Sequence, residues 1–130
     1  MAQRSTRQRR AIRLVFEKTD RPLSTQEVLT AAKEHEQGLG IATVYRTLNL
    51  LLSEGWLTTV KLPGEAPRYE RGGKPHHHHF HCVECGRVFE VPGSDELLES
   101  LVPPGFVLSD HDLVLHGRCD ECVGDTSDGE

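Results

Sequence analysis

The stretch HHHHFHCVEC, residues 76–85, places five imidazoles and two thiols within ten residues. Neutral imidazoles and thiolates are the side chains that bind transition metals most readily in proteins. A second Cys-x-x-Cys pair, Cys119 and Cys122, follows near the C-terminus. The C-terminal half of this 130-residue chain is therefore predicted to fold around bound metal.

The two Cys-x-x-Cys pairs, Cys82 with Cys85 and Cys119 with Cys122, are the most specific metal signal in the sequence. Each pair can bind one ion from a single turn, and four thiolates at about 2.3 Å complete the tetrahedron that Zn²⁺ accepts. Two disulfides are the alternative. We see no signal peptide and no apolar run near the ~20 residues of a membrane span, which predicts a cytoplasmic location and reduced thiols. A structural Zn²⁺ ion that is coupled to folding is therefore expected.

Side chains alternate along an extended chain, so the histidine run can supply two separate sites. One face would carry His77, His79 and His81, and the other His76, His78 and Phe80. Further ligands within reach by pattern are Glu70, Glu90, Asp95, Glu96 and His111. Mixed imidazole and carboxylate ligation suits Zn²⁺, Fe²⁺, Mn²⁺ or Co²⁺, so the ligand set leaves the metal open. A purification tag and a solvated histidine surface are the alternatives.

Charge is segregated along the chain, whose net charge is −5. Residues 1–62 carry ten Lys and Arg against six Asp and Glu, whereas residues 63–130 carry five against fourteen. Five arginines crowd the N-terminus: Arg4, Arg7, Arg9, Arg10 and Arg13. A basic half suits a polyanion and an acidic half rich in His and Cys suits cations, although such clusters are also typical of solvated surface.

Three short helices are predicted in the basic half. Ser5 or Thr6 can cap the first, and a capping box of Ser24 and Glu27 begins the second, over about residues 25–35. The third is predicted over residues 43–54, after a glycine-rich turn, with an apolar face of Val44, Leu48, Leu51 and Leu52. This order favours a helix-turn-helix with the third helix in the reading position.

On that third helix, Arg46 would contact phosphate or guanine, and Tyr45 would pack on sugar or a thymine methyl. The alternative is an ordinary exposed pair.

Short β-like runs at residues 57–62 and 68–70 flank a Pro-Gly turn and predict a hairpin, which after a helix-turn-helix is a wing. Residues 71–75, RGGKP, then read as a linker.

Residues 40–48, GIATVYRTL, and residues 76–86, HHHHFHCVECG, together resemble the recognition-helix and metal motifs of the ferric uptake regulator family of metal-dependent transcription factors. The resemblance covers about residues 5–123. It implies an α+β fold, in which an N-terminal winged helix-turn-helix domain is followed by a small α/β dimerisation domain with structural zinc. It also implies a repressor that binds double-stranded, palindromic operator DNA as a metal-loaded homodimer and controls metal homeostasis genes.

On this basis the winged-helix domain is predicted over residues 1–71, the hinge linker over 72–75 and the metal-binding dimerisation domain over 76–123. Residues 124–130 are small, polar and acidic, and are predicted to be a disordered tail.

The resemblance also assigns ligands to three sites. Cys82, Cys85, Cys119 and Cys122 match the structural Zn²⁺ site. Glu70, His77, His79 and Glu90 match a hinge site that senses metal. His76, His78 and His111 match an additional site, whose usual glutamate aligns with Glu96 or Asp95. Tyr45 and Arg46 match the DNA-contacting pair, and Thr43 and Arg10 are predicted to bind DNA beside them.

The chain departs from the family pattern at four positions. Pro22 stands where iron and peroxide sensors have a histidine, and Gly72 stands where many zinc sensors have a linker cysteine. His81 and His116 stand where apolar or aromatic residues are more usual. The missing early histidine argues against the peroxide-sensing branch. The regulatory metal is predicted to be Zn²⁺ or Fe²⁺, with Zn²⁺ preferred and Mn²⁺ less favoured.

Two other classes of protein compete with a metal-sensing regulator. A zinc-dependent hydrolase would need an open metal position beside a general base, whereas a four-cysteine site is coordinatively closed. A metal buffer or chaperone would need no basic helical half. We therefore predict a DNA-binding regulator and no enzymatic activity.

Overall fold

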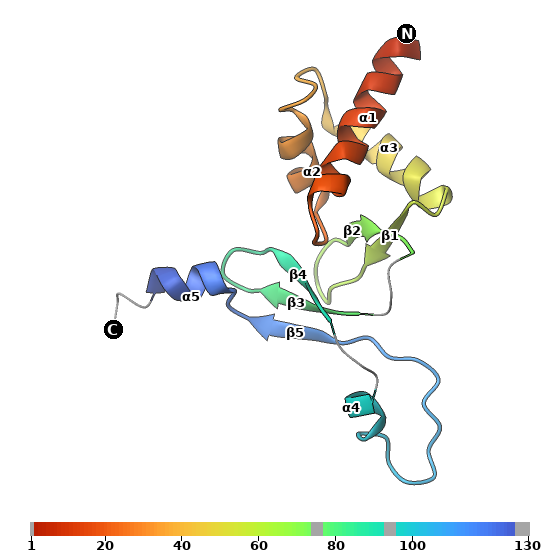
Figure 1. The fold of residues 1–130 in the computed structure, drawn as a ribbon, viewed down its shortest axis with the longest axis vertical. Coiled ribbons are helices and arrows are strands. Elements are labelled where there is room, and N and C mark those ends of the chain that lie inside the picture. Colours follow the sequence, from red (N-terminus) through yellow and green to blue (C-terminus); the bar gives the residue numbers. More distant parts are fainter. Residues whose placement is uncertain (1, 74–76, 93–95, 127–130) are drawn as a thin grey trace. The chain divides into compact units, whose positions relative to one another are not determined.

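A computed structural model describes residues 2–73, 77–92 and 96–126. The chain folds as two compact units, Met1–Gly73 and Lys74–Glu130 (Figure 1). Two of the predicted ligands, His76 and Asp95, lie outside the described residues. Within the described ranges, no helix has both the length and the apolar character needed to cross a membrane.

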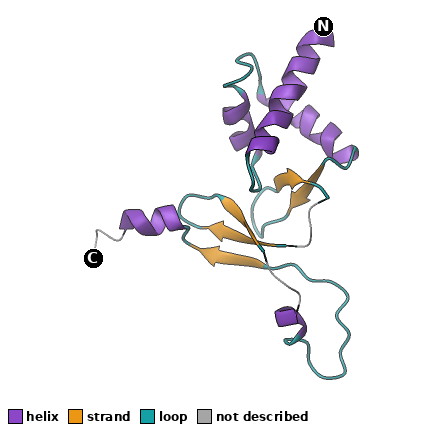
Figure 2. Ribbon diagram, in the orientation of Figure 1, coloured by secondary structure: helices purple, strands orange, loops and turns teal. Residues whose placement is uncertain are grey.

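The first unit contains helices α1 (Ala2–Lys18), α2 (Thr25–Ala32) and α3 (Ile41–Ser53), which pack together above a two-stranded sheet (Figure 2). Apolar side chains at helical spacing turn inward from all three helices, because burying them removes apolar surface from water. The most deeply buried include Ile12, Val28, Val44, Leu48 and Leu51, each with 0% of its surface exposed. This unit therefore has a hydrophobic core of its own.

The predicted capping box is confirmed at the start of α2. The backbone N–H of Ser24 donates to Glu27 Oε1 at 2.8 Å, and that of Glu27 donates to Ser24 Oγ at 3.1 Å. The predicted start of the first helix is wrong. Helix α1 begins at Ala2, so Ser5 and Thr6 lie inside it, and good helix formers in the preceding turn explain the extension.

Helix α3 begins at Ile41, two residues before the predicted start, and its N-cap Gly40 makes no side-chain capping bond. Gly55 follows the helix with a φ of 78°, the left-handed conformation expected after a helix C-terminus. The chain then forms the antiparallel hairpin of β1 (Leu57–Val60) and β2 (Arg68–Arg71), as predicted. Backbone hydrogen bonds between Leu23 and Tyr69, both 2.8 Å long, attach this hairpin to the segment that precedes α2.

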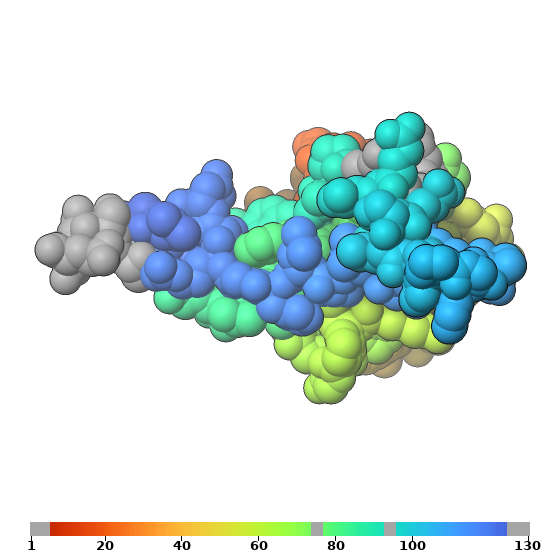
Figure 3. Space-filling model, turned by 90° about the horizontal axis from the view of Figure 1, so that it is seen from below, coloured from red at the N-terminus to blue at the C-terminus, as the bar shows by residue number. Residues whose placement is uncertain are grey.

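The second unit is built on a three-stranded sheet in the order β4-β3-β5. Strand β3 (His78–Cys82) pairs antiparallel with β4 (Val88–Val91) and parallel with β5 (Val114–Gly117). The parallel pairing requires a long crossover, which contains the short helix α4 (Glu96–Glu99) and the extended loop after it (Figure 1). The segment around α4 and this loop, coloured cyan to blue, lies at the molecular surface in Figure 3.

Three predictions for this unit need correction. The sequence predicts a short helix that is capped by Ser94 and runs through residue 101 or 102, but helix α4 ends at Glu99. The sequence also predicts an extended run over residues 106–116, of which only residues 114–116 lie in a strand, β5. Helix α5 (Asp120–Thr126) was not predicted, and it includes three residues of the tail predicted to be disordered. Two acidic residues in its first turn, Asp120 and Glu121, favour a helix there through the helix dipole.

The core of the second unit is small. Its cluster of buried residues consists of Cys82, Cys119 and Cys122, with Phe89 packed against it. Among the described residues of this unit, Val88 is the only fully buried aliphatic side chain. A unit with so little buried apolar surface is expected to need a crosslink to stay folded.

Candidate metal centres and nucleic-acid interface

The four cysteines converge on one point of the second unit. The Sγ atoms of Cys82 and Cys122 are 3.6 Å apart, and those of Cys85 and Cys119 are 3.8 Å apart. All four sulfurs lie within 4.8 Å of one another. A disulfide would bring two sulfurs to about 2.05 Å, whereas a tetrahedron with zinc–sulfur bonds of about 2.3 Å has edges of about 3.8 Å. The cluster therefore fits a tetrahedral Zn²⁺ ion.

Backbone groups hold the cysteines in this arrangement. The N–H groups of Cys85 and Cys119 both donate to Cys82 Sγ, at 3.4 and 3.3 Å. Gly86, with a φ of 82°, lets the chain turn tightly after Cys85, and its N–H donates to the carbonyl of Cys82 at 2.9 Å. The local fold thus forms a knuckle that presents both thiols of the first pair inward.

These contacts also set the charge of the thiols. The backbone N–H of Cys85, followed in effect by that of Cys119, lowers the pKa of Cys82 to about 6, although burial opposes the shift. Burial raises the pKa of Cys122, and the neighbouring Cys82 adds to this shift. The cluster therefore offers a thiolate at neutral pH at Cys82, whereas metal binding must remove a proton from Cys122.

His77 and His79 lie together on one face of the second unit's sheet. Their rings meet edge to face with centroids 4.8 Å apart, and His77 Nε2 is 3.9 Å from Glu90 Oε1. Glu90 is placed there by the register of the sheet, which pairs it with His79. These three predicted ligands are thus neighbours. Glu70, predicted to join them, is in β2 of the first unit with 5% of its surface exposed.

The opposite face carries His78, whose ring centroid is 5.3 Å from that of His111. His78 is 5% exposed and its Nε2 atom is buried, while His111 comes from the loop before β5. The structure therefore brings together two ligands of the predicted additional site. Glu96 is exposed at the start of α4.

Helix α3 presents the predicted DNA-contacting residues on its outer face. Tyr45 is 50% exposed and Arg46 is exposed, whereas Val44 and Thr47 turn into the core. Arg46 Nη2 donates to Thr43 Oγ1 at 3.0 Å, so both polar groups lie on the same part of the helix surface. Arg10 is exposed on α1.

Comparison with known proteins decides between the competing classes. The sequence profile of the ferric uptake regulator family matches residues 1–116. The chain belongs to the ferric uptake regulator family. Members of this family are metal-responsive transcriptional regulators and not enzymes, which excludes the hydrolase, and the predicted α+β winged-helix fold class is confirmed.

Individual relatives in this family are named for different metals. The ferric uptake regulation protein of Bacillus subtilis (strain 168) is 35% identical over 128 residues, which span 92% of this chain and 85% of the relative. The zinc uptake regulation protein of Mycobacterium tuberculosis (strain ATCC 25618 / H37Rv) is also 35% identical, over 123 residues that span 92% of this chain and 94% of the relative.

Solved structures agree with this assignment. A zinc-bound manganese uptake regulator is 29% identical, with a TM-score of 0.79 and coverage of 86% of this chain and 87% of that chain. A zinc uptake regulator in complex with zinc and DNA is 28% identical, with a TM-score of 0.55 and coverage of 92% and 83%. Relatives similar to this chain are thus named for iron, zinc and manganese.

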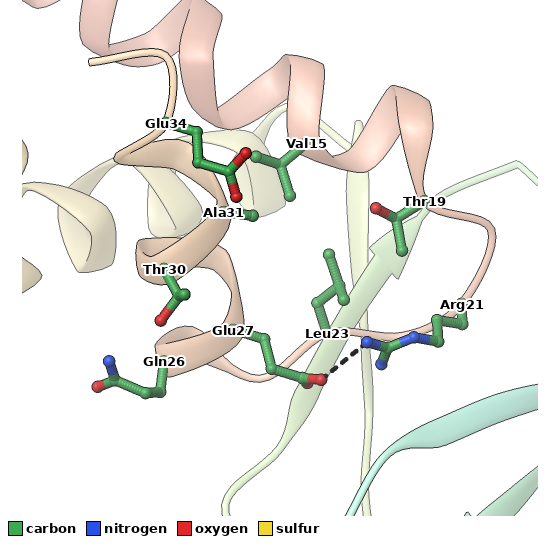
Figure 4. Close-up of a pocket in the computed structure, with 9 residues that line it drawn as sticks. All are labelled: Val15, Thr19, Arg21, Leu23, Gln26, Glu27, Thr30, Ala31 and Glu34. Carbon is green, nitrogen blue, oxygen red and sulfur yellow. Dashed lines mark ion pairs between the residues drawn. The ribbon is translucent and has the colours of Figure 1, made fainter. Parts of the chain in front are cut away.

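The structure describes the surroundings of Pro22 and Gly72, the two positions that depart from the family's sensing ligands. Pro22 is fully buried between Arg21 and Leu23, which line a hollow of about 320 Å³ between α1 and α2 (Figure 4). Across this hollow, Arg21 forms an ion pair of 3.0 Å with Glu27. Gly72 is tightly packed, because a Cβ there would lie 2.6 Å from the carbonyl oxygen of Gly55. A linker cysteine at that position would require the backbone to move.

Arg87 contributes to the cysteine site and was not predicted from the sequence. Its Nε donates to Cys85 Sγ at 3.3 Å, and its Nη2 lies 3.9 Å from Cys119 Sγ and 3.2 Å from Glu121 Oε2. The hydrogen bond from Arg87 lowers the pKa of Cys85. One Zn²⁺ with four thiolates carries a net charge of about −2, so this guanidinium offsets part of that charge. A basic residue soon after Cys-x-x-Cys was the available signal.

Proposed function

We propose that this protein is a repressor of metal homeostasis genes, which binds operator DNA as a metal-loaded homodimer. One observation carries the proposal: a winged-helix unit with an exposed Tyr45-Arg46 pair on α3 shares a chain with clustered thiol and imidazole ligands. A metal buffer would not need the first feature. A protein that acts in this way on a bacterial chromosome works in the cytoplasm.

In this proposal α3 lies in the major groove. The helix is held by a buried apolar face, so its outer face keeps a fixed orientation relative to the rest of the unit. Arg46 contacts backbone phosphate or guanine, and Tyr45 packs on sugar or a thymine methyl. Ile41, 42% exposed at the start of the same helix, adds an apolar group that can also meet a thymine methyl.

The four cysteines hold the structural Zn²⁺ ion, which supplies a crosslink between the β3–β4 knuckle and the start of α5. Cys82 and Cys85 come from the knuckle, and Cys119 and Cys122 from the C-terminal segment. The crosslink joins segments more than thirty residues apart in sequence, so closing it removes much freedom from the unfolded chain. Folding of the dimerisation domain is thereby coupled to zinc.

The regulatory ligands proposed are Glu70, His77, His79 and Glu90. Glu70 is the penultimate residue of β2 in the wing, and His77 follows it by seven residues, across a segment that contains Gly72 and Gly73. Residues from both units that ligate one ion restrain this segment and hence the orientation of α3. The ion can shift that equilibrium only by the difference in its affinity for the restrained and unrestrained forms.

Zn²⁺ is the regulatory metal that we propose ahead of Fe²⁺. Imidazole and carboxylate ligands bind Zn²⁺ more tightly than Fe²⁺ or Mn²⁺ at the same site. Pro22 stands where iron and peroxide sensors have a histidine, so a ligand typical of those sensors is missing, which also supports Zn²⁺. The ferric uptake regulation protein of Bacillus subtilis and the zinc uptake regulation protein of Mycobacterium tuberculosis are both 35% identical to the chain, so their identity does not decide between the two metals.

A homodimer is supported by exposed apolar side chains around α4 and the loop after it. Leu97, Leu101, Phe106 and Val107 are 75%, 73%, 71% and 90% exposed. Clustered apolar residues of this size are rarely left in water by a stable monomer. We therefore assign dimerisation to this segment of the second unit.

Operator binding with and without metal tests the proposal. Fluorescence anisotropy of a labelled operator duplex should show tight, salt-sensitive binding at buffered free Zn²⁺ and at least tenfold weaker binding when Zn²⁺ is chelated from the regulatory site. The same titration with Fe²⁺ and Mn²⁺ at matched free concentrations ranks the metals. Equal affinity with and without metal would contradict a metal-dependent repressor.

A further inference from the structure

His81 and His116 lie side by side on the second unit's sheet. Parallel pairing of β3 and β5 puts these two residues directly opposite one another. Their Nδ1 atoms are 3.3 Å apart, and their rings meet at 81° with centroids 5.4 Å apart. Neither residue belongs to the four-cysteine cluster or to the two histidine sites assigned above.

We propose that His81 and His116 form a further binding site for Zn²⁺. In a tetrahedral site with zinc–nitrogen bonds of about 2.0–2.1 Å, two ligand nitrogens lie about 3.3–3.4 Å apart. The observed Nδ1 separation of 3.3 Å therefore matches one edge of such a tetrahedron. A linear, two-coordinate ion would require about 4 Å between the same atoms, so the spacing favours tetrahedral Zn²⁺ over linear coordination.

The residues around His81 and His116 leave the other coordination positions of the ion to water. On the other side of His81, the sheet register places the aliphatic Val88, which cannot ligate a metal. His81 is 7% exposed, whereas His116 is exposed, so water can reach the outer positions of the tetrahedron. Two protein ligands with water in the remaining positions form a site that exchanges its ion faster than the closed cysteine site.

The site adjoins the regulatory ligands. His81 is two residues from His79 and shares its face of β3, a distance of about 7 Å along an extended strand. An ion held by His81 and His116 would therefore lie next to His77 and His79 on the same face of the sheet. This placement suits a loading position, from which Zn²⁺ is passed to the more complete site.

A simple hydrogen bond is the competing explanation, since one Nδ1–H could donate to the other Nδ1 at this distance. The two explanations differ in what a substitution removes. Loss of a hydrogen bond leaves the number of bound ions unchanged, whereas loss of a ligand removes one ion.

Zinc stoichiometry of the full-length chain tests the inference. Equilibrium dialysis at a series of buffered free Zn²⁺ concentrations should show one fewer ion per chain for His116→Gln than for the unaltered protein. His81→Gln and the double variant should lose the same single ion, because either ligand is required. His35→Gln, which removes an exposed histidine of the first unit, is the matched control and should lose none.

His81 adjoins Cys82, so damage to the cysteine site must be distinguished from loss of the proposed ion. His116→Gln lies on the neighbouring strand and carries the test alone if His81→Gln unfolds. In Zn²⁺-soaked crystals, an anomalous peak should lie about 2.1 Å from both Nδ1 atoms. Unchanged stoichiometry in His116→Gln, or no peak there while the cysteine site is filled, would overturn the proposal.

Discussion

Replacing Cys119 by serine should unfold the Lys74–Glu130 unit and leave Met1–Gly73 folded. Cys119 is 7% exposed, belongs to the four-sulfur cluster, and also places a backbone N–H 3.3 Å from Cys82 Sγ. Serine keeps the shape of the side chain and removes the soft thiolate that Zn²⁺ requires. The variant therefore tests the ion's contribution with little change in packing.

The expected loss in free energy of unfolding exceeds the stability of the second unit. Structural Zn²⁺ contributes on the order of 10 kcal/mol to small domains of this kind. Val88, the only fully buried aliphatic residue among those described in the unit, contributes about 1.5–3 kcal/mol. Typical domains are stable by only about 5–15 kcal/mol in total, so losing most of the zinc contribution leaves the unit unfolded.

The single tryptophan allows the two units to be followed separately. Trp56 lies in the first unit, with the guanidiniums of Arg13 and Arg71 at 4.9 and 4.3 Å from its ring. Its fluorescence in a urea titration should be unchanged in Cys119→Ser, while amide NMR signals from β3, β4 and β5 should lose their dispersion. Val83→Ser, a 62% exposed position in the same knuckle, is the control and should retain both. Dispersed sheet signals in a zinc-free Cys119→Ser protein would show that the second unit folds without zinc.

Three further predictions concern single side chains. Arg46→Ala should weaken binding to all DNA sequences and reduce the magnitude of the slope of log affinity against log salt by about 0.9 for each chain, which is about 1.8 for the homodimer. Tyr45→Ala should cost about 1–3 kcal/mol of discrimination between operator and random DNA. An unchanged salt slope for Arg46→Ala would refute the phosphate contact. Gly72→Ala should destabilise the first unit by about 1–3 kcal/mol, because the new Cβ would lie 2.6 Å from the Gly55 carbonyl oxygen. Urea titrations followed by Trp56 fluorescence measure this change. An unaltered unfolding midpoint would show that the backbone moves at no cost in free energy. Arg87→Gln should raise the pKa of Cys85, since Arg87 lowers it, so protons would displace zinc at a higher pH. A chromophoric chelator that follows zinc release against pH measures this, and an unmoved midpoint would contradict the assigned contact.

Local signals in the sequence predicted the first unit well. The capping box of Ser24 and Glu27 and the buried positions Val44, Leu48 and Leu51 each depend on neighbours within a few residues. Such short-range patterns are visible in a sequence. The early start of α1 was missed because several good helix formers precede the supposed capping residues, and a helix needs no side-chain cap to begin.

Long-range pairing explains most of what the sequence could not predict in the second unit. Alternation along residues 77–82 correctly separated His79 from His78, because the period of a strand is local. The parallel register between β3 and β5 is set by tertiary packing, so the contact between His81 and His116 was not foreseen. The contact of Arg87 with Cys119, thirty-two residues away, was missed for the same reason.

Operator affinity measured against free Zn²⁺ for His79→Ala and His78→Ala determines on which face of the sheet the regulatory metal binds. The two histidines are adjacent in β3 and project from opposite faces of the sheet. We expect that His79→Ala keeps the fold and the dimer and loses metal-activated binding, whereas His78→Ala keeps activation and changes metal stoichiometry and stability. Loss of activation in His78→Ala together with its retention in His79→Ala would contradict the account and move the regulatory metal to the other face of the sheet.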